Sequence, residues 1–375
     1  MVFVVNLARV VFAPLIQPAA ADFGVSVASL GIVTTAAWLG SAAGRLPTGY
    51  LLTRFRRHQL IIASGAVLVV AALFASVTRS VTGLTIGAFL MGLSSGIYLI
   101  AANPLISELF PHGVGRAVGI HGMSLQIAAA AAPLIVSGVL LVGNWRRTFT
   151  LIAIITAGVT VALVVVATRT DLPNAGTDDT SLFAAGRSQW PMLVTVIALV
   201  GVTAFLWNGL FNLYGDYLEV AKDIGPGSGR LLLSLMFAAG IPGFLLTGRL
   251  ADRVPNMPLI CGIIGSFTLS VVGLTLAESL LVIAAMSLVM GYTIHSLFAA
   301  TDRFLLFSLP DENRASAYAI YSTIMMFIQA LGPVSVGQLV TNGVSYGQTF
   351  QLLAIAVGLV LGSVLVLYRT GSLPT

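Results

Sequence analysis

The amino-acid sequence predicts an all-α membrane protein with twelve transmembrane helices in two pseudo-symmetric halves of six. Its composition, its series of long apolar segments and a weak internal repeat support this fold class. Of the 375 residues, 57% are hydrophobic and 8% are charged, and the mean hydropathy is +1.00. Soluble globular domains carry roughly 25% charged residues. A chain with so few charges cannot cover a water-facing surface, so lipid must surround most of it.

Twelve apolar segments are long enough to cross a bilayer, which requires about 20 mostly apolar residues per helix. The first begins at Met1, and we interpret it as a helix rather than a cleaved signal because no basic residue precedes its apolar run. The expected spans are 1–21, 27–52, 60–78, 82–109, 117–142, 148–168, 191–215, 230–248, 258–277, 280–308, 317–340 and 349–368.

One polar stretch separates the sixth span from the seventh. It contains three aspartates together with Pro173 and Gly176, a composition typical of loops. We therefore predict a cytoplasmic linker at 169–190 that joins an N-terminal half, 1–168, to a C-terminal half, 191–375. The other connections are shorter and leave no room for a separate soluble domain.

The two halves share a repeat with an offset close to 199 residues. The segment 49–54 (Gly-Tyr-Leu-Leu-Thr-Arg) matches 248–253 (Gly-Arg-Leu-Ala-Asp-Arg). Parallel repeats of this size are typical of membrane transporters. Further pairs at offsets of 199 to 201 are Met91-Gly92 with Met290-Gly291, Pro111 with Pro310, Pro133 with Pro333, Gly138 with Gly337, and Thr148-Phe149 with Thr349-Phe350.

The basic residues predict the orientation. If the N-terminus is inside, the inner loops contain ten arginines and the outer loops contain five basic residues. Loops that stay in the cytoplasm carry the excess of Lys and Arg. We therefore expect a multi-pass protein of the cell (plasma) membrane with both termini in the cytoplasm. The inner set is Arg54, Arg56, Arg57, Arg116, Arg169, Arg187, Arg249, Arg253, Arg314 and Arg369, and the outer set is Arg79, Arg146, Arg147, Lys222 and Arg230.

Polarity varies among the spans with a period of three. Spans 3, 6, 9 and 12 have no charged residue, Asn or His. Spans 1, 4, 7 and 10 are the polar ones, so we expect them to face water or substrate. An ionisable group at membrane depth costs about 2.5–3.5 kcal/mol and usually points into the bundle. The polar residues are Asn6, Arg9, Gln17, Asn103, Asn208, Asn212, His295, Asp302 and Arg303.

Three of these polar residues, together with Arg45 of span 2, are predicted to lie in one layer on the cytoplasmic side of the midplane. Arg9 lies about 12 Å from the start of its span, at 1.5 Å per residue. Arg45, Asn103 and Asp302 lie about 9–10 Å before the cytoplasmic ends of theirs. We assign substrate binding to Arg9, Arg45, Asn103, Asn208, His295, Asp302 and Arg303.

Each assignment has a structural alternative. Asp302 could form an ion pair with one of the arginines of the layer, and Arg303 could extend to the inner membrane surface. His295 is equally explained as a packed core histidine or as a pocket donor. These readings stay open at this stage.

Other function classes are disfavoured. The four histidines lack metal-ligand spacing, and there is no phosphate loop of the GxxxxGK[ST] kind, so we expect no metal, no cofactor and no enzymatic activity. The net charge of +5 comes from dispersed arginines without a block of like charges, which argues against a nucleic-acid partner. The lone Cys261 excludes an intramolecular disulfide.

The ends of the second and eighth spans resemble the loop signature of the major facilitator superfamily. That pattern is a glycine, three residues, an aspartate, a basic residue, then a glycine and more basic residues. The resemblance implies the fold of that family and a cytoplasmic gate motif made of Gly49 and Arg54 with Gly248, Asp252 and Arg253.

Other segments carry the resemblance further and also show departures from it. The segment 144–149 (Asn-Trp-Arg-Arg-Thr-Phe) resembles the Gly-Trp-Arg-x-x-Phe loop between helices 5 and 6. In the first half Thr53 replaces the signature acid, which implies a weaker gate. Ala88 stands where drug/proton antiporters of the family carry an arginine, and Ala132-Pro133 only loosely matches their helix 5 Gly-Pro motif. Both departures count against a standard drug efflux pump.

The two arginines point to a substrate class. Arg9 is similar to the helix 1 arginine of branches that move organic anions or phosphate esters. Arg45 is similar to the helix 2 arginine of nitrate/nitrite porters, but Phe244 stands where those porters have a second arginine. Their glycine-rich motif is also missing, which disfavours nitrate itself.

The leading hypothesis is a secondary active transporter that works by alternating access and moves a small organic or inorganic anion. Arg9 and Arg45 would bind it, because the guanidinium fork binds carboxylate or phosphate bidentately. Asp302 is the proton-coupling candidate, with H⁺ as the coupling ion. One alternative is multidrug or metabolite efflux by proton antiport, and another is a non-transporting membrane sensor.

Overall fold

The computed structural model describes residues 1–52, 54–110, 114–170, 172, 182–250, 254–309 and 314–371. Helices are the only regular secondary structure in these ranges. The chain divides into two compact units, Met1–Asp179 and Thr180–Thr375. The division falls inside the stretch predicted as a linker, although a helix already begins at Leu182.

The helices of each unit follow one another with short connections. Unit 1 contains α1 (Val2–Val10), α2 (Phe12–Phe23), the short 3-10 helix η1 (Ala28–Leu30), α3 (Gly31–Leu51), α4 (Arg57–Val77), α5 (Val81–Leu109), α6 (Val114–Val142) and α7 (Arg147–Arg169). Unit 2 contains α8 (Leu182–Asn212), α9 (Tyr214–Lys222), α10 (Pro226–Ala238), α11 (Gly240–Leu250), α12 (Asn256–Leu276), α13 (Leu280–Ser308), α14 (Arg314–Thr341) and α15 (Tyr346–Arg369).

Helices occupy all twelve predicted spans. Within the described ranges, ten helices or helix pairs are long and apolar enough to cross a membrane, and α1 with α2, bent by 43°, raises the number to eleven. The remaining span is α3, a helix of 21 residues that carries Thr34, Ser41 and Arg45. The all-α fold class is therefore confirmed.

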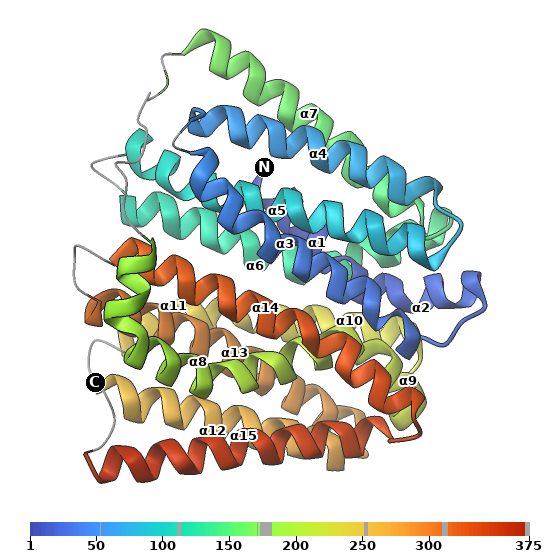
Figure 1. The fold of residues 1–375 in the computed structure, drawn as a ribbon. Helices are drawn as coiled ribbons and strands as arrows, with labels where there is room; N and C mark the ends of the chain where they lie inside the picture. The colour runs from blue at the N-terminus through green and yellow to red at the C-terminus, as the bar shows by residue number, and fades with distance from the viewer. Residues whose placement is uncertain are drawn as a thin grey trace. The chain divides into compact units, whose positions relative to one another are not determined.

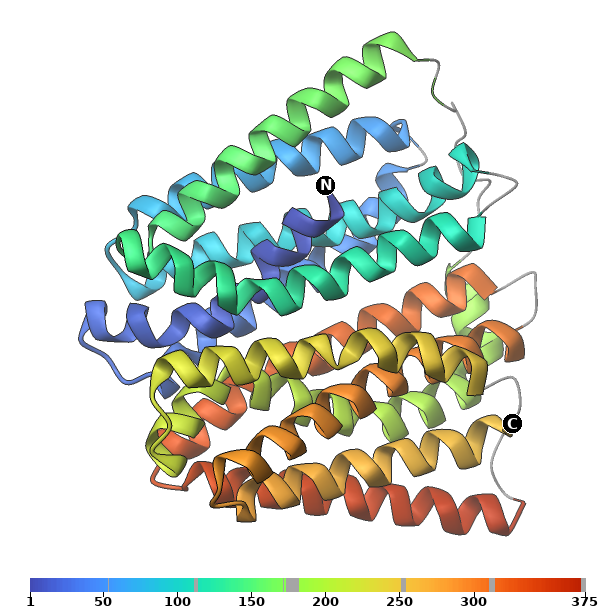
Figure 2. The ribbon, with the colours of Figure 1, turned by 180° about the vertical axis from the view of Figure 1, so that it is seen from behind.

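The packing of the two units repeats helix by helix. In unit 1, α3 packs on α5, α4 packs on α7 (Figure 1), and α1 packs on α6. In unit 2, α10 and α11 pack on α13, α12 packs on α15 (Figure 2), and α8 packs on α14. Each pair in one unit has its counterpart in the other, so the internal repeat seen in the sequence is also a repeat of tertiary contacts.

Glycines at equivalent positions allow the closest of these crossings. A Cβ atom added to Gly92 on α5 would lie 1.9 Å from the carbonyl oxygen of Ala37 on α3. A Cβ atom added to Gly291 on α13 would lie 1.9 Å from the carbonyl oxygen of Met236 on α10. Because small residues let helix backbones approach each other in membranes, the recurrence of Gly92 as Gly291 has a direct packing cause.

The helices α7 and α15, which correspond to the sixth and twelfth predicted spans, are the least buried of the candidate membrane spans in the described ranges. In the most apolar stretch of each, only 22% of the residues are buried, compared with 67% in α8. Both helices expose rows of aliphatic side chains, including Val161 and Val165 on α7 and Ile355 and Leu359 on α15. These faces suit contact with lipid, as the polarity period of the sequence indicated.

The side chains of segment 144–149 hold two helix ends of unit 1 together. Arg146 forms an ion pair with Asp22 at 2.7 Å, and its guanidinium lies 4.4 Å from the ring centroid of Trp145. Trp145 contacts Phe23 edge-on at 5.6 Å and Phe149 at 5.9 Å. The motif that resembles the family therefore joins the end of α2 to the start of α7.

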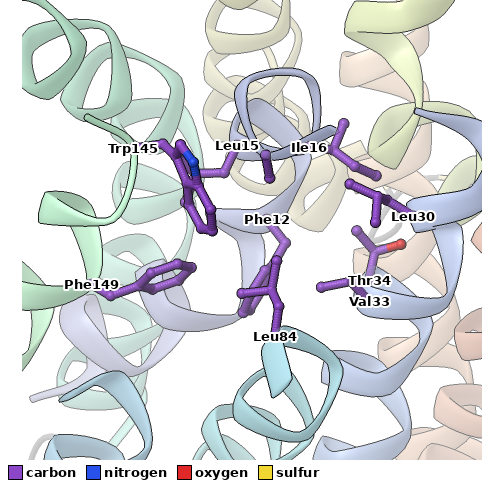
Figure 3. Close-up of a pocket in the computed structure, with 10 residues that line it drawn as sticks. Phe12, Leu15, Ile16, Leu30, Val33, Thr34, Leu84, Trp145 and Phe149 are labelled. Carbon is purple, nitrogen blue, oxygen red and sulfur yellow. The ribbon is translucent and has the colours of Figure 1, made fainter. Parts of the chain in front are cut away.

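A narrow pocket lies beside this motif (Figure 3). Its walls come from α2, η1, α3, α5 and α7, and its side chains are almost entirely apolar. Without charged groups it cannot compensate the desolvation of an ion, so it is not the predicted anion site. The residues labelled in the view are Phe12, Leu15, Ile16, Leu30, Val33, Thr34, Leu84, Trp145 and Phe149.

Helix α9 carries a partly buried acid whose protonation should affect stability. The hydroxyl of Tyr346 donates a hydrogen bond to Asp216 at 2.5 Å. Burial raises the pKa of the Asp216 carboxyl, the hydrogen bond from Tyr346 opposes this, and the negative charge of Glu219 adds to it. The net effect is a pKa above the ordinary value.

This raised pKa predicts a pH dependence of unfolding. The folded state binds the proton more tightly than the unfolded chain, so the contribution of Asp216 is greatest below about pH 4 and is lost as the pH rises through the folded-state pKa. In Asp216→Asn the amide oxygen still accepts the bond from Tyr346 and no proton is exchanged. We expect the melting temperature of this variant to fall less between about pH 4 and pH 7 than that of the parent. Glu278→Gln, at an exposed position, serves as the control, and equal slopes in all three proteins would contradict the prediction.

Candidate functional site

The first predicted span is broken immediately after its arginine. Helix α1 ends at Val10, α2 starts at Phe12, and their axes differ by 43°. Pro14 lacks the backbone N–H that would bond the carbonyl of Val10, and its ring clashes with that carbonyl, so a straight helix is disfavoured. Arg9 lies in the last turn of α1, where the helix dipole favours a positive charge.

Neutral groups hold Arg9 in place. Its Nη2 donates a hydrogen bond to Oδ1 of Asn6 at 2.7 Å, and its guanidinium lies 4.5 Å from the ring centroid of Trp38 on α3. Asn6 is itself buried and donates through Nδ2 to the carbonyl of Leu125 on α6 at 2.7 Å. The Nε atom of Arg9 is buried and has no hydrogen-bond partner among the described residues. This charge is therefore oriented but has no acidic partner in the described part of the chain.

The second candidate arginine, Arg45, is close enough to Arg9 for their positive charges to interact. It is seven residues after Trp38 on α3, which places both side chains on one face of the helix. Arg45 is partly buried, and its positive charge interacts unfavourably with that of Arg9. Two guanidinium groups that repel each other at membrane depth form a positive region suited to an anion.

The structural counterpart of Arg9 in unit 2 is an asparagine. Asn208, 199 residues later, is fully buried on α8. Its backbone carbonyl and its Oδ1 accept hydrogen bonds from Nδ2 of Asn212 at 2.8 and 2.9 Å. Nδ2 of Asn208 and Oδ1 of Asn212 are buried without a partner among the described residues. This pair thus retains one donor and one acceptor that a polar ligand could bind.

His295 packs inside an aromatic cluster. Its ring is 5.7 Å from Trp207, 5.9 Å from Phe244 and 6.4 Å from Phe298, measured between centroids. Its Nδ1 is 2.7 Å from the carbonyl of Gly291, to which a protonated Nδ1 donates. The ring is buried. Of the two readings open from the sequence, this geometry favours a packed core histidine.

The cluster also explains a glycine next to a helix break, and the break itself follows from Pro242, four residues after the last residue of α10. Helix α10 ends at Ala238 and α11 begins at Gly240. A Cβ atom at Gly240 would lie 2.6 Å from the ring of His295. The imidazole therefore occupies space that any other residue at position 240 would need.

Asp302 and Arg303 have different surroundings although they are neighbours on α13. The carboxylate of Asp302 acts electrostatically on the buried Tyr321 of α14. Arg303 donates from Nη1 to Oδ1 of Asn256, the first residue of α12, at 3.2 Å. Arg303 thus ties α13 to the start of α12, while Asp302 lies beside a tyrosine hydroxyl inside unit 2.

Among the residues that the structure describes, the other predicted site residues do not lie together. Asn103 is exposed near the end of α5. Of the gate motif, Gly49 is exposed in the last turn of α3, and the guanidinium of Arg54 lies 5.3 Å from the ring centroid of Tyr50. Gly248 lies on α11. Asp252 and Arg253 are outside the described residues.

Sequence reasoning did not assign roles to the residues that orient Arg9. Asn6 is three residues before Arg9, within side-chain reach on a helix. Trp38 is seven residues before Arg45, and tryptophan is the side chain that best attracts a guanidinium to its face. These spacings contained the signal, but only the fold brings Arg9 of α1 to the ring of Trp38 on α3.

Comparison with known proteins gives consistent results. The family model of the Major Facilitator Superfamily matches residues 1–293 and 218–374. The probable sulfoacetate transporter SauU of Cupriavidus necator is 23% identical and aligns with 96% of this chain and 89% of its own. Multidrug resistance protein D of Escherichia coli is 26% identical over 68% of this chain and 64% of its own.

Solved structures agree with the fold. A bacterial homolog of the human lysosomal transporter Spinster, in an inward-facing and unoccupied conformation, superimposes with a TM-score of 0.81. The two are 16% identical, and the match covers 98% of this chain and 95% of the other. Since the family model covers the chain from the first helix to the last, the protein belongs to the Major Facilitator Superfamily of membrane transporters.

Proposed function

We propose that the protein is a secondary active transporter of a small organic anion that carries a carboxylate or a sulfonate group. The observation that supports this most strongly is the environment of Arg9. Its guanidinium is fixed by Asn6 and Trp38, which are neutral, and shares its field with Arg45. A positive pair held in this way, without an acid beside Arg9 in the described structure, is well placed to bind an oxyanion.

The substrate class follows from the geometry of the guanidinium group. Arginine offers parallel N–H donors that match the two oxygens of a carboxylate or sulfonate, and it stays charged when partly buried. The relative SauU is described as a probable sulfoacetate transporter, and sulfoacetate carries both groups. Two arginines in one unit suit a substrate that carries two anionic groups, or a substrate with one strongly hydrated anionic group.

The proposal includes coupling and orientation. Asp302, beside Tyr321, is the residue that would exchange the coupling proton. Transport would proceed by alternating access in the plasma membrane, with both ends of the chain in the cytoplasm. The excess of arginine in the predicted inner loops supports this orientation.

The experiment combines binding with flux. The purified protein is heated in detergent with sulfoacetate, acetate, methanesulfonate, phosphate or the lipophilic cation tetraphenylphosphonium. An anion that binds only the folded state at 100 times its dissociation constant should stabilise it by about 2.7 kcal/mol. The stabilising anion should then accumulate in proteoliposomes under an inward proton gradient. Stabilisation by the cation alone, with no anion flux, would overturn the proposal.

A second candidate is efflux of cations or metabolites by proton antiport. It is favoured by the aromatic residues around His295, which could stack on a flat lipophilic ligand, and by the similarity to multidrug resistance protein D. Asp302 would then attract the cation. In that case Asp302→Asn should eliminate cation efflux, whereas Arg45→Gln should leave it unchanged.

A further inference from the structure

Unit 1 contains a second, polar pocket that the transport proposal does not use. It lies where the last turn of α7 meets the first turn of α4, and its volume is about 500 Å³. Three basic side chains and two hydroxyl groups dominate its lining, and neither Arg9 nor Arg45 contributes to it. These residues are Arg56, His58, Thr168, Arg169 and Thr170.

The positive charge of this pocket is available for a ligand. The adjacent Arg57 forms an ion pair with Glu108 on α5, but neither Arg56 nor Arg169 is paired with an acidic side chain among the described residues. The charge of Arg56 also acts on His58, whose Nδ1 is buried without a hydrogen-bond partner in the described structure. The lining therefore presents two guanidinium groups to the same hollow, with the ring of His58 beside them.

Two further features favour a phosphate group over a cation. Arg56 is the N-cap residue of α4, so the positive end of the helix dipole lies at the pocket. Helix N-termini of this kind bind phosphate readily, and arginine adds bidentate hydrogen bonds. Charge, dipole and donors thus all point to an anion.

The position of the pocket identifies the source of the phosphate. The turn of α7 that precedes Arg169 exposes Val164, Val165 and Val166, and Val161 continues this apolar surface one turn further. A ligand with its head group on the arginines would therefore lay an apolar tail along α7. This end of unit 1 is also the one predicted to face the cytoplasm, where bilayers carry anionic lipids.

We propose that Arg56, His58 and Arg169 form a binding site for the phosphate group of an anionic phospholipid, whose acyl chain lies along the exposed face of α7. The site is separate from the substrate arginines and would hold the ends of α4 and α7 together. Its occupancy does not depend on what the protein transports.

The test measures lipid binding to the purified full chain by native mass spectrometry, with phosphatidylglycerol and phosphatidylcholine as probes. Each arginine near an anionic surface contributes about 1 kcal/mol, so the double variant Arg56→Gln/Arg169→Gln should bind phosphatidylglycerol about 30-fold more weakly. Phosphatidylcholine binding should stay the same. Arg79→Gln is the control, because this exposed arginine follows the other end of α4.

Three outcomes would overturn the proposal. The first is unchanged phosphatidylglycerol affinity in the double variant, and the second is an equal loss in Arg79→Gln. The third is thermal stabilisation by inorganic phosphate that equals that of phosphatidylglycerol and disappears in the double variant, which would make the site one for a soluble phosphate. A circular dichroism spectrum matching that of the parent shows that the double variant is folded.

Discussion

Replacing Arg45 by glutamine is expected to abolish uptake of the transported anion without lowering the thermal stability of the empty protein. Glutamine keeps a polar side chain but removes the charge and the guanidinium fork. Loss of one partner from a desolvated, hydrogen-bonded charge pair costs about 2–5 kcal/mol, which corresponds to a roughly 30- to 4000-fold weaker affinity. Because the charges of Arg9 and Arg45 repel each other, the same substitution relieves an unfavourable interaction in the unliganded state.

A loss of uptake without a loss of thermal stability distinguishes a binding residue from a structural one. Replacing a residue that supports the fold would lower the uptake and the melting temperature together. Arg45→Lys retains the charge without the fork and should give intermediate uptake. Arg79→Gln, which changes an exposed arginine between α4 and α5, should transport normally. The measurement is initial uptake into proteoliposomes, and undiminished uptake in Arg45→Gln would contradict the assignment.

The architecture could be predicted because lipid imposes strong rules on sequence. A helix must satisfy its own backbone hydrogen bonds in the bilayer, so each span is a long apolar run. The common offset of the repeat also had a structural meaning, since Gly92 and Gly291 allow equivalent close crossings. The interruptions of the helices also have local causes, although the sequence analysis did not predict them. The break at Val11 follows from Pro14 and the break at Ala239 follows from Pro242, because each proline lies four residues after the end of a helix and cannot bond its last carbonyl.

The sequence predicts only those residues of the candidate site that carry a charge within an apolar span. Arg9 and Arg45 are conspicuous because a guanidinium is rare in an apolar span. Trp38 is as common in a packed core as in a binding site, so its contact with Arg9 becomes visible only when α1 and α3 are placed. The role of His295 likewise depended on rings from α8, α11 and its own helix. The pair formed by Asp216 and Tyr346 joins residues 130 positions apart, a separation that no local pattern reveals.

The glycine crossings lead to a second prediction with a large effect. In Gly92→Ala the new Cβ atom would lie 1.9 Å from the carbonyl oxygen of Ala37 and 2.8 Å from its carbonyl carbon. Both are backbone atoms, so α3 and α5 must move apart. Overpacking of a well-packed core costs about 1–3 kcal/mol and sometimes more. We expect a marked fall in the melting temperature in detergent, and the same for Gly291→Ala against Met236 in unit 2.

The control for these variants comes from glycines of the same protein that face open space. A Cβ atom at Gly122 or Gly138 on α6 would meet nothing within 4 Å, and alanine is favoured over glycine in a helix interior by about 1 kcal/mol. Gly122→Ala and Gly138→Ala should therefore leave the melting temperature unchanged or raise it. If α3 and α5 separate in Gly92→Ala, Trp38 and Arg45 on α3 move with them, and anion affinity should fall even at temperatures where the variant is folded. Equal melting temperatures for Gly92→Ala and Gly122→Ala would show that the crossing tolerates a side chain, and that the repeated glycines are not needed for close approach.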